Sequence, residues 1–230
     1  MKKLWGIALL CVGMLSGAMA EPYTPIKSLE EILSIREEGG KYFVNFDLNK
    51  LQTAVLNFEK HARTYPVTFD SRMEQQQAID DVILVDMLSV IYPFNNDIAT
   101  LQLFLRLNAV AYNLDHNPLE SLKRFDKTAN LLLELKEDDA SLHNFIANFQ
   151  ASTGQYDNAE THFKRAIELG DTHSYYGLGL VYLSQDQDEK ALEVMKEYRT
   201  HHPSSNNIDE VISIIERGDY EIKKMPETPS

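Results

Sequence analysis

The sequence predicts an all-α fold in which long helices are joined by short turns. Glycine is absent between residues 41 and 153, and the prolines between residues 27 and 225 number four: Pro66, Pro93, Pro118 and Pro203. Because glycine and proline are the residues that most often interrupt helices, this spacing leaves room for long helices. Helix-start residues recur along the chain, at Asp47, at Asp70, at Asn96 or Asp97 and at Asp139, and strands have little support.

The chain begins with a segment typical of a secretory leader. Lys2 and Lys3 precede an apolar run, and Ala18-Met19-Ala20 has the small-x-small pattern of a signal-peptidase site. We therefore expect residues 1–20 to be cleaved off and the mature protein to be periplasmic or secreted from a bacterium. The apolar run is shorter than a membrane-spanning helix requires, which disfavours an anchor. Lipidation at Cys11 is disfavoured because a leucine precedes it.

Removal of this leader would leave a strongly acidic chain without cysteine. Cys11 is the single cysteine, and the loss of Lys2 and Lys3 changes the formal net charge from −13 to −15. Disulfides and thiol chemistry are thereby excluded from the mature chain. The negative charge disfavours binding to nucleic acid and to anionic membrane surfaces. Either solubility alone or a basic protein partner would account for it.

Capping and stop signals divide the remaining chain into helices. Ser28 and Glu31 form a capping box before a short helix that we expect to end near Gly39-Gly40. Further helices are expected over residues 47–65, 70–92, 96–114, 117–136, 139–153, 157–169, 172–184, 188–201 and 207–217.

The later helices come in pairs that repeat along the chain. At an offset of 32 residues, Ala147 corresponds to Gly179, Ala159 to Ala191 and Phe163 to Met195. This pattern resembles the tetratricopeptide repeat family, whose unit is two antiparallel helices of about 34 residues. The residues that carry the resemblance are Tyr175, Leu178, Gly179, Tyr182, Ala191 and Pro203 in residues 172–205, Ala147, Gly154, Tyr156, Ala159, Phe163 and Ala166 in residues 140–171, and Ala109, Tyr112, Ser121 and Phe125 in the weaker copy 102–139.

The resemblance implies antiparallel helix-pair repeats stacked in a right-handed superhelix over residues 101–206. Residues 21–100 are then a divergent helical region, in which we interpret the helix at 70–92 as an extra element. Residues 207–224 are expected to form the capping helix that an open-ended array requires, and residues 225–230 a disordered tail.

Two glycines lie inside the expected helix 172–184, where each costs about 0.5–1 kcal/mol relative to alanine. The resemblance assigns Gly179 to the close crossing of the two helices of one unit, against Ala191. Gly177 lies on a different face, so we interpret it as a contact with a neighbouring helix, with the approach of a bound peptide as the alternative.

No constellation of residues predicts catalysis. Gly177 and Gly179 lack the third glycine of a dinucleotide fingerprint, and neither a Walker loop nor a His-Glu-x-x-His motif occurs. His201 and His202 are adjacent on a helix, so their side chains diverge, which disfavours a metal site. We therefore expect no catalytic residue, no metal and no cofactor.

The resemblance also implies a binding surface. In this family, residues at two places of each first helix line the concave side of the superhelix and contact an extended peptide. In this sequence these places, with Asn113 one turn further on, are occupied by Arg106, Val110, Asn113, Asn144, Asn148, Tyr176 and Leu180. Asparagine suits such a role because its amide offers both donors and an acceptor to a partner backbone. An ion pair inside the protein is an equally good interpretation of Arg106.

The function that follows is an analogy from the resemblance. We expect a non-catalytic scaffold that binds a peptide or helix of an envelope protein in its concave groove, in cell-envelope or pilus assembly. The alternative is an accessory regulatory subunit of a cell-wall enzyme, bound through a convex or terminal surface.

Overall fold

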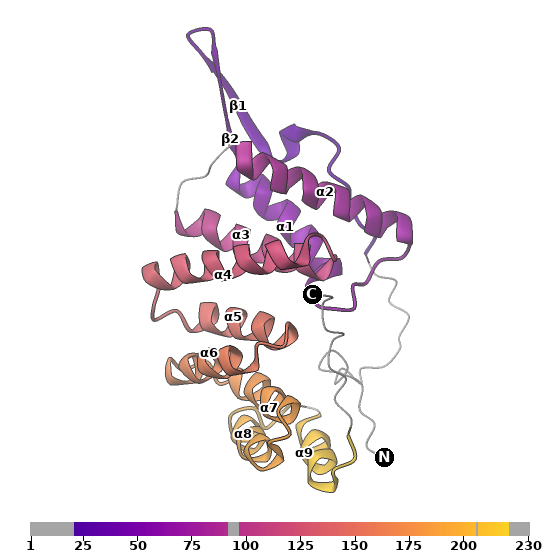
Figure 1. The fold of residues 1–230 in the computed structure, drawn as a ribbon, viewed down its shortest axis with the longest axis vertical. Helices are drawn as coiled ribbons and strands as arrows, with labels where there is room; N and C mark the ends of the chain where they lie inside the picture. The colour runs from indigo at the N-terminus through magenta and orange to yellow at the C-terminus, as the bar shows by residue number, and fades with distance from the viewer. Residues whose placement is uncertain (1–20, 92–96, 206, 221–230) are drawn as a thin grey trace. The chain divides into compact units, whose positions relative to one another are not determined.

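The computed structural model describes residues 21–91, 97–205 and 207–220. These residues form two compact units, which we call the N-terminal unit (described residues up to Leu135) and the C-terminal unit (described residues from Lys136). Both are predominantly helical, as the sequence predicts (Figure 1). The expected leader and the expected tail at residues 225–230 lie outside the described residues. Among the described residues, no helix is long and apolar enough to cross a membrane.

The N-terminal unit opens with a β-hairpin where the sequence analysis expects a helix. A single 3-10 turn, η2 (Leu29–Glu31), is followed by the antiparallel strands β1 (Leu33–Glu38) and β2 (Lys41–Phe46). Gly39 and Gly40 have φ values of 60° and 76°, as a two-residue hairpin turn requires, so they end no helix. The Ser28 side chain makes no capping hydrogen bond. The predicted capping box and short helix are therefore wrong.

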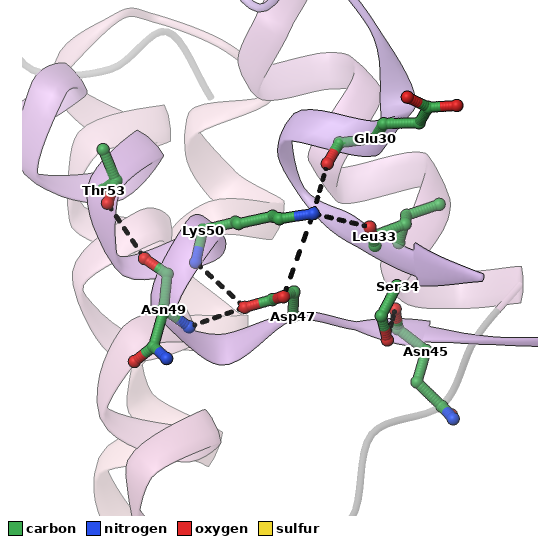
Figure 2. Close-up of polar contacts among 8 residues, drawn as sticks. All are labelled: Glu30, Leu33, Ser34, Asn45, Asp47, Asn49, Lys50 and Thr53. Atoms are coloured by element: carbon green, nitrogen blue, oxygen red, sulfur yellow. Dashed lines mark hydrogen bonds and ion pairs between the residues drawn. The ribbon is translucent and has the colours of Figure 1, made fainter. Parts of the chain in front are cut away.

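Four helices follow in this unit: α1 (Leu48–Ala62), α2 (Arg72–Ile91), α3 (Ile98–Asn113) and α4 (Pro118–Leu135). Asp47 caps α1 by accepting hydrogen bonds from the backbone N–H groups of Asn49 and Lys50 at 3.1 and 3.3 Å (Figure 2). Asp97 caps α3 in the same way. At the start of α2 it is the hydroxyl of Ser71, not Asp70, that accepts from the N–H of Glu74.

The helices of the N-terminal unit pack in an order that differs from their order in the sequence. Helix α3 pairs with α4, and α1 packs directly on α3. Helix α1 therefore relates to α3 as the second helix of one repeat relates to the first helix of the next. This packing favours the interpretation of α2 as an extra element.

An extended segment, residues 21–28, is tied to this unit by a buried polar anchor. The Tyr23 hydroxyl donates to Asp81 at 2.8 Å, and the backbone N–H of Ile26 donates to the same carboxylate oxygen at 2.9 Å. Tyr23 and Asp81 are 5% and 4% exposed. Burial and the neighbouring Asp81 carboxylate both raise the pKa of the Tyr23 hydroxyl, which keeps it a donor.

The C-terminal unit consists of five helices, which begin and end close to the predicted residues. They are α5 (Ala140–Ser152), α6 (Tyr156–Glu168), α7 (Ser174–Ser184), α8 (Asp188–His201) and α9 (Ile208–Arg217). Each pair, α5 with α6 and α7 with α8, forms a helical hairpin, and α6 packs on α7. The positions that correspond at the 32-residue offset share their environment, since Ala159 and Ala191, and likewise Phe163 and Met195, are almost completely buried.

The two glycines of α7 each accept a bulky side chain from a packed helix. A Cβ at Gly177 would lie 2.4 Å from Cζ of Phe163 on α6, so the predicted contact with a neighbouring helix is present. A Cβ at Gly179 would lie 2.6 Å from Cε of Met195 on α8, and the three nearest atoms all belong to Met195. The predicted close contact of Gly179 with α8 is therefore present, and the side chain nearest to it is that of Met195.

The two glycines should differ in how well they tolerate alanine. Gly177→Ala forces a Cβ against the ring of Phe163, which is 1% exposed and rigid, so we expect a loss of roughly 1–2 kcal/mol in the free energy of unfolding. Gly179→Ala meets mainly the flexible end of Met195 and should cost less. Urea denaturation of the two variants beside the wild type measures both values. A larger loss in Gly179→Ala than in Gly177→Ala would contradict this packing.

Candidate functional site

Helix α5, which carries two of the predicted binding residues, is fixed at its start by Asp139. The carboxylate accepts hydrogen bonds from the Leu142 N–H at 3.1 Å and the Ser141 hydroxyl at 2.6 Å, and it pairs with the Lys136 ammonium. Burial alone would raise the pKa of Asp139, but these three partners lower it to about 2. The capping carboxylate is therefore charged at neutral pH, and the orientation of α5 is well defined.

A chain of hydrogen bonds, which we call the amide row, connects α5 to α7. Asn148 donates through Nδ2 to the carbonyl and the side-chain oxygen of Asn144, at 2.8 and 2.9 Å. Asn144 donates to the Ser174 hydroxyl at 2.7 Å, and Ser174 donates to Asp171 at 2.8 Å. Asn144 is thus committed to holding the two helices together. Asn148 is exposed, and within the described part of the chain no donor is paired with its Oδ1.

Beside the amide row, rings from the start of α7 and the end of α8 form a second feature, which we call the tyrosine–histidine cluster: His173, Tyr176, Tyr198 and His202. The ring centroids lie 5.3 Å apart for Tyr176 and Tyr198, 4.6 Å for Tyr198 and His202, and 4.1 Å for His173 and His202. His173 is exposed, and the other three are half-buried. The cluster therefore presents aromatic surface to solvent.

The neighbouring His201 points elsewhere, as expected for adjacent helical residues. Its ring stacks on Tyr175 with centroids 5.6 Å apart, whereas His202 Nε2 lies 3.0 Å from the Thr172 hydroxyl. Among the residues that the structure describes, no group of three or more His, Cys, Asp or Glu side chains is placed to hold a metal ion. Sequence reasoning considered the two histidines only as metal ligands and missed their contacts with tyrosine.

Leu180 does not lie on an open surface. It is 9% exposed and belongs to the core of the C-terminal unit. Its burial contradicts its predicted place in a solvent-accessible groove, because the packed helices enclose it. In this unit the exposed Asn148 and the half-buried Asn144 and Tyr176 remain as the surface part of the predicted set.

Of the three predicted residues of the N-terminal unit, Arg106 and Asn113 bond to α1, and Val110 and Asn113 are buried. Arg106 Nε donates to Glu59 at 2.8 Å, and its Nη2 contacts the other oxygen of the same carboxylate. Val110 is 1% exposed, and Asn113, at 6%, donates to the Ala62 carbonyl at 3.0 Å. Because α1 covers this face of α3, the expectation that these residues line an open groove is not supported. For Arg106, the alternative of an internal ion pair is the one observed.

A histidine pair joins α5 to α6. The Nδ1 atoms of His143 and His162 lie 2.9 Å apart, and His143 Nε2 lies 2.9 Å from the Glu137 carbonyl. Since a carbonyl only accepts, His143 carries its proton on Nε2 when neutral, and His162 Nδ1–H donates to it. Burial, and then the proximity of His143, lower the pKa of His162. In this arrangement the proton of the bridge belongs to His162.

Comparison with known proteins identifies two segments of the C-terminal unit. Residues 140–169 and 172–198 match the model of the tetratricopeptide repeat family. Among solved structures, three show similarity: TTC0263, a thermophilic TPR protein in Thermus thermophilus, with 15% identity over 74% of this chain and 92% of that chain (TM-score 0.48); MamA, with 20% over 73% and 83% (0.44); and YrrB, a TPR protein with an unusual peptide-binding site, with 18% over 72% and 85% (0.45). A search of curated proteins finds no match.

The histidine pair predicts a pH dependence of stability. Because the folded state lowers the pKa of His162, the unfolded chain binds more protons once the pH approaches 6.5, the value for an unperturbed histidine. The free energy of unfolding should therefore fall as the pH drops below this value. His162→Gln keeps a donor for His143 but does not titrate, so its stability should change less over the same range. Denaturant titrations of both proteins above and below pH 6.5 test this, and parallel curves would contradict it.

Proposed function

We propose that this chain, whose residues 140–169 and 172–198 match the model of the tetratricopeptide repeat family, is a non-catalytic scaffold of the bacterial periplasm. In this proposal it binds an extended segment or a helix of another envelope protein, during the assembly of the cell envelope or of a pilus. Proteins with this repeat bind other proteins or peptides, which supports the general role. The envelope setting rests on the leader-like residues 1–20.

The observation that carries the proposal is the set of hydrogen-bond acceptors that the amide row leaves available to a partner. Asn148 Nδ2 already donates to two oxygens of Asn144, so the group that Asn148 offers to a partner is the acceptor Oδ1. Asp171 adds a carboxylate at the other end of the row. A surface of acceptors suits a partner that supplies donors, either from an extended backbone or from basic side chains.

The tyrosine–histidine cluster supports a basic partner in a second way. The faces of Tyr176 and Tyr198 attract cations, and an Arg or Lys side chain of the partner fits such a site. The formal net charge, −13 for the whole sequence and −15 after the loss of Lys2 and Lys3, would steer a basic segment toward this protein and would disfavour an acidic one. We therefore include a basic segment in the proposal.

Site-specific crosslinking in the periplasm tests the binding surface. A photo-reactive amino acid in place of Asn148 should crosslink to a partner protein, because this exposed side chain lies on the proposed surface. The same amino acid in place of Glu193, an exposed residue of α8, serves as the control and should give no such product. Mass spectrometry identifies the partner. Crosslinks from Glu193 and none from Asn148 would favour an accessory subunit that is bound through another surface.

Once the partner is identified, the variants Asn148→Ala and Asn144→Ala distinguish an effect on binding from an effect on stability. Asn148→Ala should weaken the complex by about tenfold with little change in the free energy of unfolding, because an exposed acceptor is lost. Asn144→Ala also removes the bond to Ser174 and should lower stability. Titration calorimetry and urea denaturation give the two quantities. Full affinity in Asn148→Ala would remove the amide row from the proposal.

The proposed localisation can be tested separately. Processing after Ala20 predicts that the mature protein begins at Glu21 and is recovered from the periplasmic fraction or the medium. Amino-terminal sequencing and intact-mass measurement of protein from fractionated cells establish both points. An unprocessed chain that stays in the cytoplasm would contradict the envelope role but would leave the binding surface untouched.

A further inference from the structure

The β-hairpin of the N-terminal unit is a two-stranded sheet within the described residues, and its register shows which backbone groups point away from the partner strand. The N–H of Asp47 donates to the Ile32 carbonyl, so residues 32 and 47 form a hydrogen-bonded pair, as do 34 with 45, 36 with 43 and 38 with 41 in alternation. The intervening residues point their N–H and C=O groups outward. On β2 these include Tyr42 and Val44, whose backbone groups have no partner within the described ranges.

The outer edge of β1 is protected against pairing. Its outer half carries three consecutive charged residues, Arg36, Glu37 and Glu38. At its base, Lys50 Nζ donates to the carbonyls of Glu30 and Leu33 at 2.7 and 3.5 Å (Figure 2). Charged residues and an occupied carbonyl are both devices by which proteins prevent the addition of a strand.

The edge of β2 has no such protection. Residues 42–46 read Tyr-Phe-Val-Asn-Phe, without a charge or a proline. The side chains of Tyr42 and Phe43 are 71% and 44% exposed, and the ribbon extends away from the helices of its unit (Figure 1). An exposed strand edge of aromatic and β-branched residues is a template for a further strand.

We propose that the edge of β2 pairs with β2 of a second copy of this chain, antiparallel and centred on Phe43, to form a four-stranded sheet. In this register Tyr42 of each copy faces Val44 of the other, and the two outward-pointing residues exchange both backbone hydrogen bonds. Four such bonds form across the two-fold axis. All the donors and acceptors involved are the outward groups identified above.

The side chains favour a second copy over an unrelated strand because this edge is complementary to itself. On one face, the Tyr42–Val44 pairs join aromatic to β-branched side chains, a favourable cross-strand combination. On the other face the two Phe43 rings meet, each with the Arg36 guanidinium of its own copy 5.7 Å from the ring centroid. No like charges become direct cross-strand neighbours at the new edge.

Charge also selects the antiparallel arrangement. Each chain carries a formal net charge of −13, so two copies repel unless their helices are kept apart. Antiparallel ribbons point their tips in opposite directions, which places the helices of the two N-terminal units at opposite ends of the joint sheet. Because the paired edge is short, the dimer is expected to be weak and to depend on concentration.

Sedimentation equilibrium of the purified full-length protein, with and without changes at Tyr42, tests the dimer. The wild type should approach the mass of two chains as its concentration rises. Tyr42→Pro removes an outward N–H that the hairpin itself does not use, whereas Tyr42→Ala removes the same ring and keeps this donor. We expect the dissociation constant of Tyr42→Pro to exceed that of Tyr42→Ala by at least about tenfold.

Hydrogen exchange of the wild type gives a second readout that needs no variant. The amides of Tyr42 and Val44 should exchange more slowly as the protein concentration rises, while those of Phe43 and Asn45 are already protected by β1. A monomer at every concentration, with freely exchanging Tyr42 and Val44 amides, would overturn the proposal. So would a dimer in which Tyr42→Pro and Tyr42→Ala associate equally well. The proposed binding surface lies on α5, α7 and α8 of the C-terminal unit, so neither result bears on it.

Discussion

The contact between Phe163 and Gly177 fixes the second repeat against the first. The ring projects from α6 and occupies the space that a side chain at position 177 would fill, so α7 approaches α6 more closely than any other residue would allow. A glycine that weakens the helix locally is retained because it lets an aromatic ring become fully buried. Helix α7 also carries Ser174 and Tyr176, and the placement of the candidate surface therefore follows from this internal contact.

The surface itself shows how two identical residues acquire different roles. Asn144 and Asn148 are one helical turn apart, as the sequence reveals. Their hydrogen-bond partners, however, depend on how the helices pack. Asn144 meets Ser174 of the neighbouring helix and becomes part of the packing, while Asn148 keeps an open acceptor. The tyrosine–histidine cluster escaped sequence reasoning for a similar reason, since its four rings come from two helices and a turn and have no common spacing along the chain.

The helices were predictable because their signals are local. Asp47, Asp97 and Asp139 each cap the helix that follows them, as expected from their positions. The β-hairpin could not be predicted, because Gly39-Gly40 suits a helix stop and a tight turn equally well. The helix-start signal at Ser28 favoured the helix stop, which is incorrect. The sequence also could not predict that α1 covers the face of α3 that carries Arg106, Val110 and Asn113, since only the packing of α1 on α3 reveals it.

The anchor formed by Tyr23 and Asp81 constrains when the leader is removed, if cleavage follows Ala20 as proposed. Two residues separate the peptide bond after Ala20 from Tyr23. The Tyr23 side chain is buried in the folded unit and is held by the Asp81 carboxylate on α2. A protease needs several residues of unfolded chain on both sides of the bond it cuts, and the folded unit supplies too few. Maturation would then come before the first residues dock, so that the order of events during export is built into the position of a single tyrosine.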